Sequence, residues 1–336
     1  MTRTFIAALL ALAATSAMAQ PTEFNEATVA QLQAQMAAGT LTSVKLTSFY
    51  LDRIQALDQN GPGVNSVLEV NPDALAMAQN ADNLRARGKL LGPLHGIPVL
   101  LKDNIDTGDR MQTTAGSFAL AGKTAIRDST VAAKLRAGGA VILGKTNLSE
   151  WANFRSFFST SGWSGRGGLT HNPYSLDRNA CGSSSGSAAA AAANFAAISF
   201  GSETDGSIVC PANVNSVVGL KPTVGVTSRG GVVPISHTQD TVGPHARTVT
   251  DAAAALNVVA SRTPDPRDPA TSGVPLGWQG TGRTRPALPA DYTAFVDPNG
   301  LAGAHVGVTR QGIDSAPPQV VAAFDSAIAA IQGAGA

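Results

Sequence analysis

The chain is poor in aromatic side chains, in net charge and in cysteine. Phe, Trp and Tyr make up 5% of its 336 residues, and Lys plus Arg (24) nearly balance Asp plus Glu (23). A nucleic-acid interface usually needs a basic excess and aromatic rings that stack on bases. Composition therefore argues against nucleic acid as a partner. With 43% hydrophobic residues, the chain is long enough to bury a sizeable core.

The two cysteines do not make a disulfide framework, and they do not indicate a metal centre. Cys181 and Cys210 lie 29 positions apart, and neither has a neighbour at the spacing of zinc ligands. We expect no metal and no other cofactor. An oxidising compartment would permit a bridge between the two cysteines, but we expect two small buried thiols.

No long apolar run follows the first 20 residues, so we expect no membrane span. The N-terminus carries Arg3, an apolar run over 5–14 and an Ala-Met-Ala site that ends at Ala19. This pattern is typical of a secretory signal peptide. We therefore expect residues 1–19 to be removed, and the domain 20–336 to be periplasmic or secreted.

Helical periodicity alternates with short apolar runs, which predicts an α/β fold built in layers. Asn71 and Pro72 look like the cap and first position of a helix. The Gly- and Ser-rich stretch 159–187 is predicted to be one long ordered loop, and such loops are often functional. The expected helices are 28–38, 44–57, 71–87, 128–137, 187–193 and 318–332, and the expected strands are 97–102, 140–143, 196–200 and 305–309.

The C-terminal end repeats an earlier pattern without completing it. Residues 128–143 read as helix, Gly turn and strand, whereas the helix over 318–332 is followed by a Gly turn and the chain then stops. We therefore expect the fold to be incomplete at its C-terminus. The inward face of this last helix is expected to carry Val321, Phe324, Ile328 and Ile331.

Two short motifs suggest other chemistry. Residues 139–146 match the phosphate-binding pattern GxxxxGK[ST], but the intervening Ala-Val-Ile-Leu reads as a strand interior, where a phosphate loop cannot form. Residues 182–186 match GxSxG, the nucleophile elbow of α/β-hydrolase esterases, with Ser184 as nucleophile. No buried strand precedes this elbow, yet the partners that a triad needs occur in the chain, so this alternative stays open. They are Asp205, Asp240, His237, His245 and His305.

A third candidate joins three separate segments. Lys102 ends a buried apolar run, and burial would lower its pKa enough for it to act as a base. Ser183 lies in a tight Ser/Gly turn. Ser207 follows 24 residues later, in a turn after a predicted strand, where several backbone N–H groups can point at one oxyanion.

These segments resemble the amidase signature family, in the same order and with the same spacing, over about residues 24–333. The matching blocks are 96–102, 143–150, 181–186, 206–208 and 239–244. Within the family, 147–154, 161–164 and 203–206 are most similar to peptide amidases. The resemblance implies a mixed central β-sheet flanked by helices, the amidase signature fold.

The resemblance also implies a mechanism. Ser207 would be the nucleophile, Ser183 would follow a cis peptide bond and relay the proton, and Lys102 would be the base. The backbone N–H groups of Thr204, Asp205, Gly206 and Ser207 would form the oxyanion hole. The expected reaction is hydrolysis of a C–N bond, in a peptide C-terminal amide or another small neutral carboxamide, through an acyl-enzyme.

The sequence also departs from the family pattern. Asp205 stands where many members have glycine, and Val209 stands where many have arginine, which favours a neutral substrate. Members of the family also run well past residue 336. An inactive truncated paralogue therefore stays an alternative. A transamidation protein that passes ammonia to a tRNA-linked substrate is a further one, although the signal peptide and the balanced charge argue against it.

Overall fold

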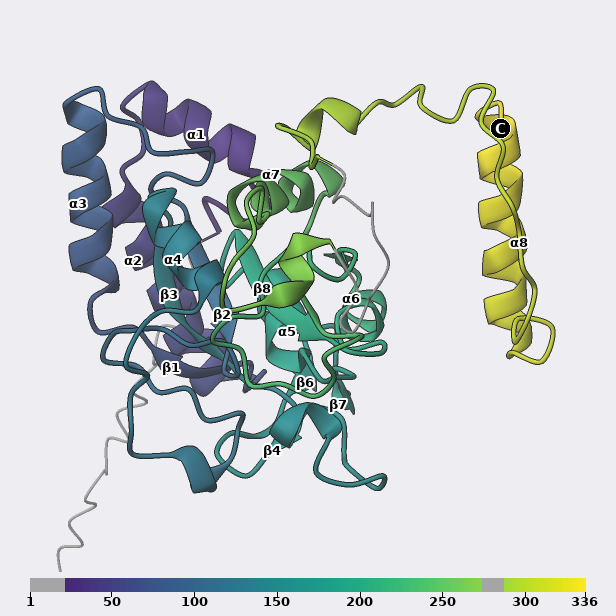
Figure 1. Ribbon diagram of the computed structural model, residues 1–336, viewed down its shortest axis with the longest axis horizontal. Helices are drawn as coiled ribbons and strands as arrows, with labels where there is room; N and C mark the ends of the chain where they lie inside the picture. The colour runs from purple at the N-terminus through teal and green to yellow at the C-terminus, as the bar shows by residue number, and fades with distance from the viewer. Residues whose placement is uncertain (1–21, 274–286) are drawn as a thin grey trace, which may run out of the picture.

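A mixed six-stranded sheet forms the centre of the molecule, in a computed structural model that describes residues 22–273 and 287–336 (Figure 1). The strand order is β1-β3-β2-β8-β10-β9. β3, β2 and β8 run parallel, and the remaining neighbours pair antiparallel. The mixed sheet flanked by helices is therefore confirmed. The strands are β1 (Val67–Val70), β2 (Pro98–Lys102), β3 (Val141–Thr146), β8 (Ile198–Glu203), β9 (Val218–Gly219) and β10 (Thr241–Ala246).

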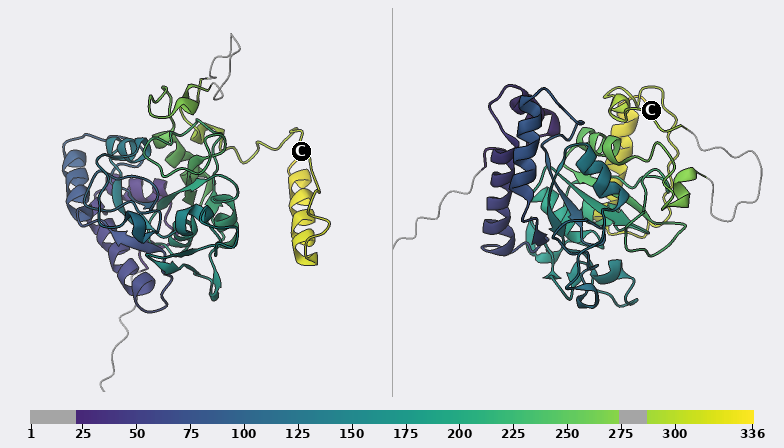
Figure 2. Two further views of the ribbon diagram at one scale, coloured as in Figure 1. Left: turned by 60° about the horizontal axis from the view of Figure 1, so that its bottom comes forward. Right: turned by 60° about the vertical axis from the view of Figure 1, so that its left-hand side comes forward.

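Helices surround this sheet, as the views in Figures 1 and 2 agree. α2 and α3 pack on each other near β3, whereas α4 and α7 form a second pair. α5 lies in the interior and contacts β2, β3, β8 and β10. The helices are α1 (Val29–Ala37), α2 (Ser43–Arg53), α3 (Ala74–Ala86), α4 (Thr130–Ala137), α5 (Ser185–Ala192), α6 (Val209–Val214), α7 (Val249–Val259) and α8 (Pro318–Gly333).

Small side chains allow α5 to approach the sheet closely. All eight of its residues are buried, and six of them are alanine or glycine. A Cβ atom added at Gly186 would lie 2.2 Å from the Ser66 carbonyl oxygen and 2.6 Å from the Asn147 nitrogen. Backbone atoms cannot yield as side chains can, so only glycine fits here. The helix that follows Ser183 is thereby fixed against the sheet that carries Lys102.

Several sequence-based elements need correction. The helix expected from Asn71 begins at Ala74 instead, because the Asn71 amide donates to the Ile142 carbonyl and its oxygen accepts from the Asp73 N–H. The stretch 159–187 is not one loop. It folds into two small hairpins before α5 begins, β4–β5 and β6–β7, which are separate from the main sheet. Their strands are β4 (Trp163–Ser164), β5 (Gly168–Leu169), β6 (His171–Asn172) and β7 (Ser175–Asn179).

The C-terminal prediction is only partly correct. α8 forms, but it lies away from the sheet (Figures 1 and 2). The four side chains expected to point inward, at 321, 324, 328 and 331, are half-exposed. Residues 305–309 are not a strand. A strand needs a neighbour for its N–H and C=O groups, and none pairs with this segment in the part of the chain described.

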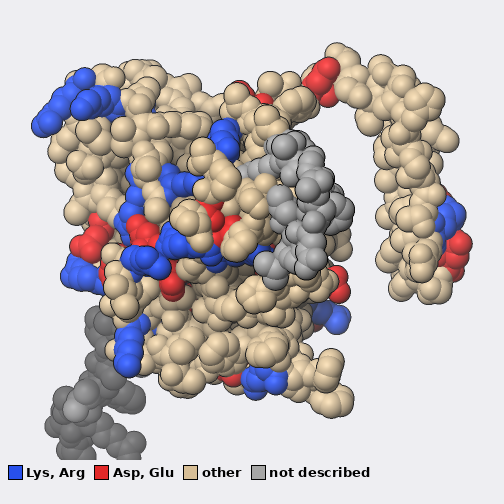
Figure 3. Space-filling view, in the orientation of Figure 1, with Lys and Arg blue, Asp and Glu red and all other residues tan. Residues whose placement is uncertain are grey.

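Charged side chains of both signs lie on the surface. Figure 3 shows basic and acidic side chains intermixed across the centre of one face. Among residues 22–273 and 287–336, no helix has the length and apolar character needed to cross a bilayer. The predicted signal peptide lies outside the described residues.

The close approach of α5 gives a stability prediction. Gly186→Ala should lower the free energy of unfolding by roughly 2–3 kcal/mol, because the new methyl group meets backbone on two sides. Gly333→Ala is the matched control, since a Cβ there has nothing within 4 Å, and its stability should change little or rise slightly. Urea denaturation of both variants checks this. Equal midpoints for the two would refute the close-packing argument.

Candidate active site

Lys102 ends β2 with its amine fully enclosed, at 0% exposure. Its Nζ atom is hydrogen-bonded to Ser183 Oγ at 2.7 Å, to Ser202 Oγ at 3.0 Å and to the Ser202 carbonyl at 3.1 Å. Asn104 Nδ2 donates to Ser202 Oγ at 2.8 Å and so fixes that hydroxyl in place. The sequence-predicted pair Lys102 and Ser183 is therefore brought together, with one amine among three oxygens.

Burial sets the protonation of this amine. It lowers the pKa of Lys102 from its ordinary value of 10.5 to about 7, although the nearby carboxylates of Asp240 and Glu203 oppose the shift. A substantial fraction of Lys102 is then neutral at neutral pH. A neutral amine has a lone pair and can accept a proton from the Ser183 hydroxyl.

The turn that carries Ser183 lies against the turn that carries Ser207. The Gly182–Ser183 peptide bond is cis, as the resemblance implied, and Ser183 is buried. The N–H group of Ser184 donates to the Ser207 carbonyl at 3.1 Å. The Ser183 carbonyl accepts the Ser149 N–H at 3.1 Å. The two serine segments, which are 24 residues apart in the sequence, are thus neighbours in space.

Glu203 holds the turn around Ser207. Its side chain is buried, with Oε1 accepting the N–H of Gly206 at 2.9 Å and Oε2 accepting those of Ile208 at 2.6 Å and Val209 at 2.9 Å. Sequence reasoning gave Glu203 no role. The sequence does place an acidic residue at the end of a buried strand, shortly before a helix. The free N–H groups at a helix N-terminus favour a carboxylate, so this position could have predicted the role of Glu203.

The assignment of four backbone N–H groups to the oxyanion hole remains a prediction, and one of the four already has a partner. The Gly206 N–H already donates to Glu203, so it would have to exchange this partner to bind an oxyanion. The N–H groups of Thr204, Asp205 and Ser207 lie in the same turn, and Ser207 itself is 6% exposed.

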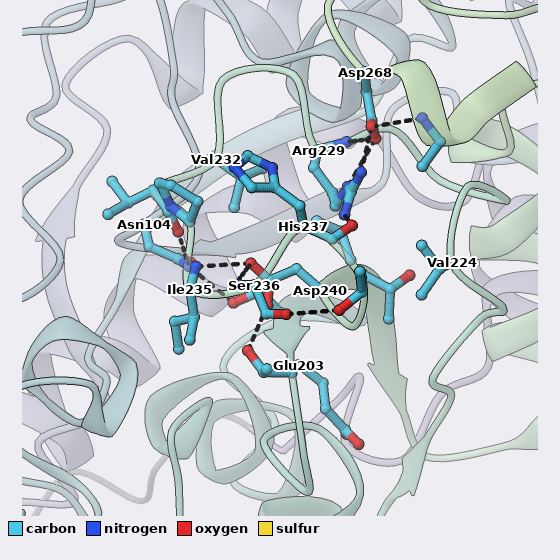
Figure 4. A pocket seen from close by; sticks show the side chains of 18 of the residues that line it. Asn104, Glu203, Val224, Arg229, Val232, Ile235, Ser236, His237, Asp240 and Asp268 are labelled. Atoms are coloured by element: carbon cyan, nitrogen blue, oxygen red, sulfur yellow. Dashed lines mark hydrogen bonds and ion pairs between the residues drawn. The ribbon is translucent and has the colours of Figure 1, made fainter. Parts of the chain in front are cut away.

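A cavity of about 690 Å³ opens over Ser183, Ser202 and Thr204 (Figure 4). Asp240 connects its wall to the serine turn. Its Oδ1 accepts the Thr204 hydroxyl at 2.5 Å, and its Oδ2 accepts the N–H groups of Ile235 and Ser236 at 2.7 and 2.9 Å. The far wall includes the apolar side chains of Val224, Val232, Val233, Pro234, Ile235 and Pro269.

Both arginines that line this cavity have an acidic partner. Arg229 contacts both carboxylate oxygens of Asp268 and donates to the His237 carbonyl (Figure 4). Arg267 bonds to Thr130 and lies 3.9 Å from Asp265. A ligand in this cavity therefore meets apolar surface, arginines held in ion pairs and the Asp240 carboxylate. In the described part of the chain, no three His, Cys, Asp or Glu side chains cluster to hold a metal.

The nucleophile-elbow alternative does not fit this geometry. Ser184 Oγ is buried between the start of α5 and β8, where it donates to the Ser202 carbonyl and accepts the Ser202 N–H. The strand before it, β7, belongs to an exposed hairpin. The His245 ring bonds to the Ile208 carbonyl through Nε2, and burial lowers its pKa to about 4. This geometry therefore does not support the esterase alternative.

The strand interpretation of residues 139–146 is confirmed. Residues 141–146 form β3, and all of them are buried. Lys145 does not face a phosphate site. Its amine donates to the Ile105 carbonyl at 2.7 Å and to the Thr113 hydroxyl at 2.9 Å.

The expectation of two free thiols is wrong. Cys181 and Cys210 form a disulfide, with Cα atoms 6.2 Å apart. The fold places the segment before α5 beside the first turn of α6, and their spacing of 29 residues along the chain does not reveal this proximity. Cα atoms at this separation are within the usual range for a bridge.

Comparison with known proteins agrees with the fold and the motifs. The amidase family model matches residues 45–336. A putative amidase of Arthroderma benhamiae is 45% identical over 91% of this chain and 49% of its own length. A glutamyl-tRNA(Gln) amidotransferase component of Microcystis aeruginosa is 41% identical, over 92% of this chain and 59% of its own.

The solved structure of native peptide amidase from Stenotrophomonas maltophilia superimposes with a TM-score of 0.85 and 51% identity. The match covers 94% of this chain and 62% of that one. The chain thus spans roughly half to three fifths of the length of these relatives. The chain belongs to the amidase family, and this membership accounts for the sheet as well as for the serine and lysine motifs.

Proposed function

We propose that this protein hydrolyses the C–N bond of a carboxamide with a Ser207–Ser183–Lys102 triad. The observation that carries the proposal is the 2.7 Å hydrogen bond between a buried Lys102 amine, with a pKa of about 7, and the Ser183 hydroxyl that lines the cavity. A base whose pKa lies near the working pH is the most effective proton acceptor.

The proposed steps assign one role to each group. Ser207 Oγ attacks the carbonyl carbon while its proton passes to Ser183, which gives its own proton to neutral Lys102. Backbone N–H groups of the 204–207 turn stabilise the oxyanion. As the C–N bond breaks, Lys102 returns the proton through Ser183 to the leaving amine or ammonia. Water then attacks the acyl-enzyme by the same relay, releases the acid and frees Ser207.

A neutral substrate with an apolar acyl part suits the cavity best. Arg229 is engaged by Asp268, so it has little charge to offer an acidic ligand. Val209 adds no cation next to the nucleophile. The apolar wall around Val232 and Ile235 favours hydrophobic acyl groups. The substrate class we infer is a peptide C-terminal amide or another small neutral carboxamide.

We also propose that the protein acts in the periplasm or outside the cell. The predicted signal peptide supports this, and so does the disulfide between Cys181 and Cys210, because disulfides persist in oxidising compartments. On the face seen in Figure 3, basic and acidic side chains are intermixed, and that face offers nucleic acid no basic stripe.

Serine variants test the assignment of roles. Ser207→Ala should lower kcat for ammonia release from a peptide amide by at least about 1,000-fold, and Ser183→Ala by a comparable factor, because each interrupts the relay. Ser185→Ala is the matched control from the same serine run. Its Oγ is buried without a hydrogen-bond partner, so its removal should leave kcat near that of the wild type.

Two results would count against the proposal. Normal turnover by Ser207→Ala would exclude Ser207 as nucleophile. A wild-type chain that unfolds cooperatively but releases no ammonia from any amide would identify an inactive paralogue.

The pH profile tests the base. Only neutral Lys102 accepts a proton, so kcat/KM should rise with pH and level off above an apparent pKa of about 7. Lys102→Ala should abolish most of the rate and flatten this acidic limb. Initial rates between pH 5 and 9 measure both, with Ser185→Ala expected to keep the wild-type profile. A near-normal rate for Lys102→Ala at neutral pH would contradict the relay.

A further inference from the structure

The disulfide lies between the two serine segments. Cys181 directly precedes the Gly182–Ser183 bond, and Cys210 is the third residue after Ser207, in the first turn of α6. Both cysteines are partly exposed. Each is also fixed locally, since the Cys181 N–H donates to Asn179 Oδ1 at 2.9 Å and the Cys210 N–H to the Gly206 carbonyl at 2.8 Å. A change in the S–S bond would therefore act on both serine turns.

The other connections between these two segments are hydrogen bonds. Ser184 N–H donates to the Ser207 carbonyl at 3.1 Å, and Asn215 Nδ2 to the Ala180 carbonyl at 3.0 Å. A third joins Asn172 Nδ2 to the Val214 carbonyl at 2.7 Å. The first two of these hydrogen bonds are buried and the third is partly buried. Each contributes only about 1 kcal/mol net, whereas a disulfide removes opened states from the ensemble. The bond therefore limits how far Ser183 and Ser207 can separate.

Lys102 bonds to Ser183, but the lysine half of the site also has supports that do not involve the disulfide. Lys102 is held by Ser202 and by the parallel pairing of β2 with β3 and β8. Glu203, at the end of β8, binds the N–H groups of Gly206 and Ile208 and so fixes the turn that carries Ser207. Loss of the disulfide should thus leave the sheet and the lysine in place and loosen only the contact between the two serine turns.

We propose that the Cys181–Cys210 disulfide positions Ser183 against Ser207, and that it is a site of thiol–disulfide exchange through which small thiols switch the amidase off. This inference rests on the proposed function. A thiolate attacks one Sγ atom, the S–S bond breaks, and a mixed disulfide forms. A second thiol then releases the cysteine, so the two cysteines gain two electrons and two protons while two thiols become one disulfide.

The experiment treats the full chain with dithiothreitol under native conditions and counts free thiols by alkylation and peptide mass spectrometry. Reduction should lower kcat for peptide-amide hydrolysis by at least tenfold, with the far-UV spectrum retained, and reoxidation should restore it. Cys181→Ser/Cys210→Ser should have the reduced enzyme's rate and should no longer respond to dithiothreitol. Full activity with both thiols free would overturn the proposal, and so would a purified oxidised protein without the bridge.

A second readout does not need turnover. Hydrogen exchange should accelerate on reduction at the Ser184 amide and in residues 206–214, while β2 and β3 keep their protection as internal controls. Unchanged exchange at Ser184 would overturn the positioning role even if the rate fell. If the oxidised wild type shows no hydrolysis that Ser207→Ala abolishes, the proposed function fails, and the exchange data still decide whether the disulfide positions the two turns.

Discussion

The buried amine of Lys102 is the constraint on which the rest of the site depends. A charged ammonium at 0% exposure is costly, and burial accordingly lowers the pKa of Lys102 to about 7. The fold tolerates this group because three oxygens, from Ser183 and Ser202, surround it within 3.1 Å. The same burial that destabilises the ammonium prepares the neutral amine for proton transfer. Stability and chemistry therefore conflict at this position.

Two carboxylates, the buried Glu203 and the half-buried Asp240, arrange the backbone around that amine. Glu203 binds three N–H groups of the serine turn, and Asp240 ties the same turn to the cavity wall. Close packing also fixes the position of Ser184 beneath the site. A Cβ at Gly201 would lie 2.6 Å from Ser184 Oγ and 2.8 Å from His245 Cε1, so the layer beneath the serines has no spare volume. The geometry of the site is thus set by neighbours that take no part in the chemistry.

Local patterns in the sequence predicted much of this. The helix expected over 28–38, the buried strand that ends at Lys102, and the serine motifs all lie within short segments, and short segments carry such signals. The failures share a long-range cause. The Cys181–Cys210 bond, the tie from Asn71 to β3 and the unpaired segment 305–309 depend on which parts of the chain meet in space. Glu203 was predictable only in part. The sequence shows an acidic residue before a helix, but it does not show the three N–H groups that the carboxylate binds.

The central claim is that Ser207 is an activated nucleophile, and covalent labelling tests it most directly. The native chain would be treated with a serine-reactive fluorophosphonate, and the labelled residue would be located by peptide mass spectrometry. The account predicts a single label on Ser207, which disappears in Lys102→Ala because the base is lost. Label on Ser183 or Ser184 instead, or no label on Ser207 in the folded chain, would contradict it.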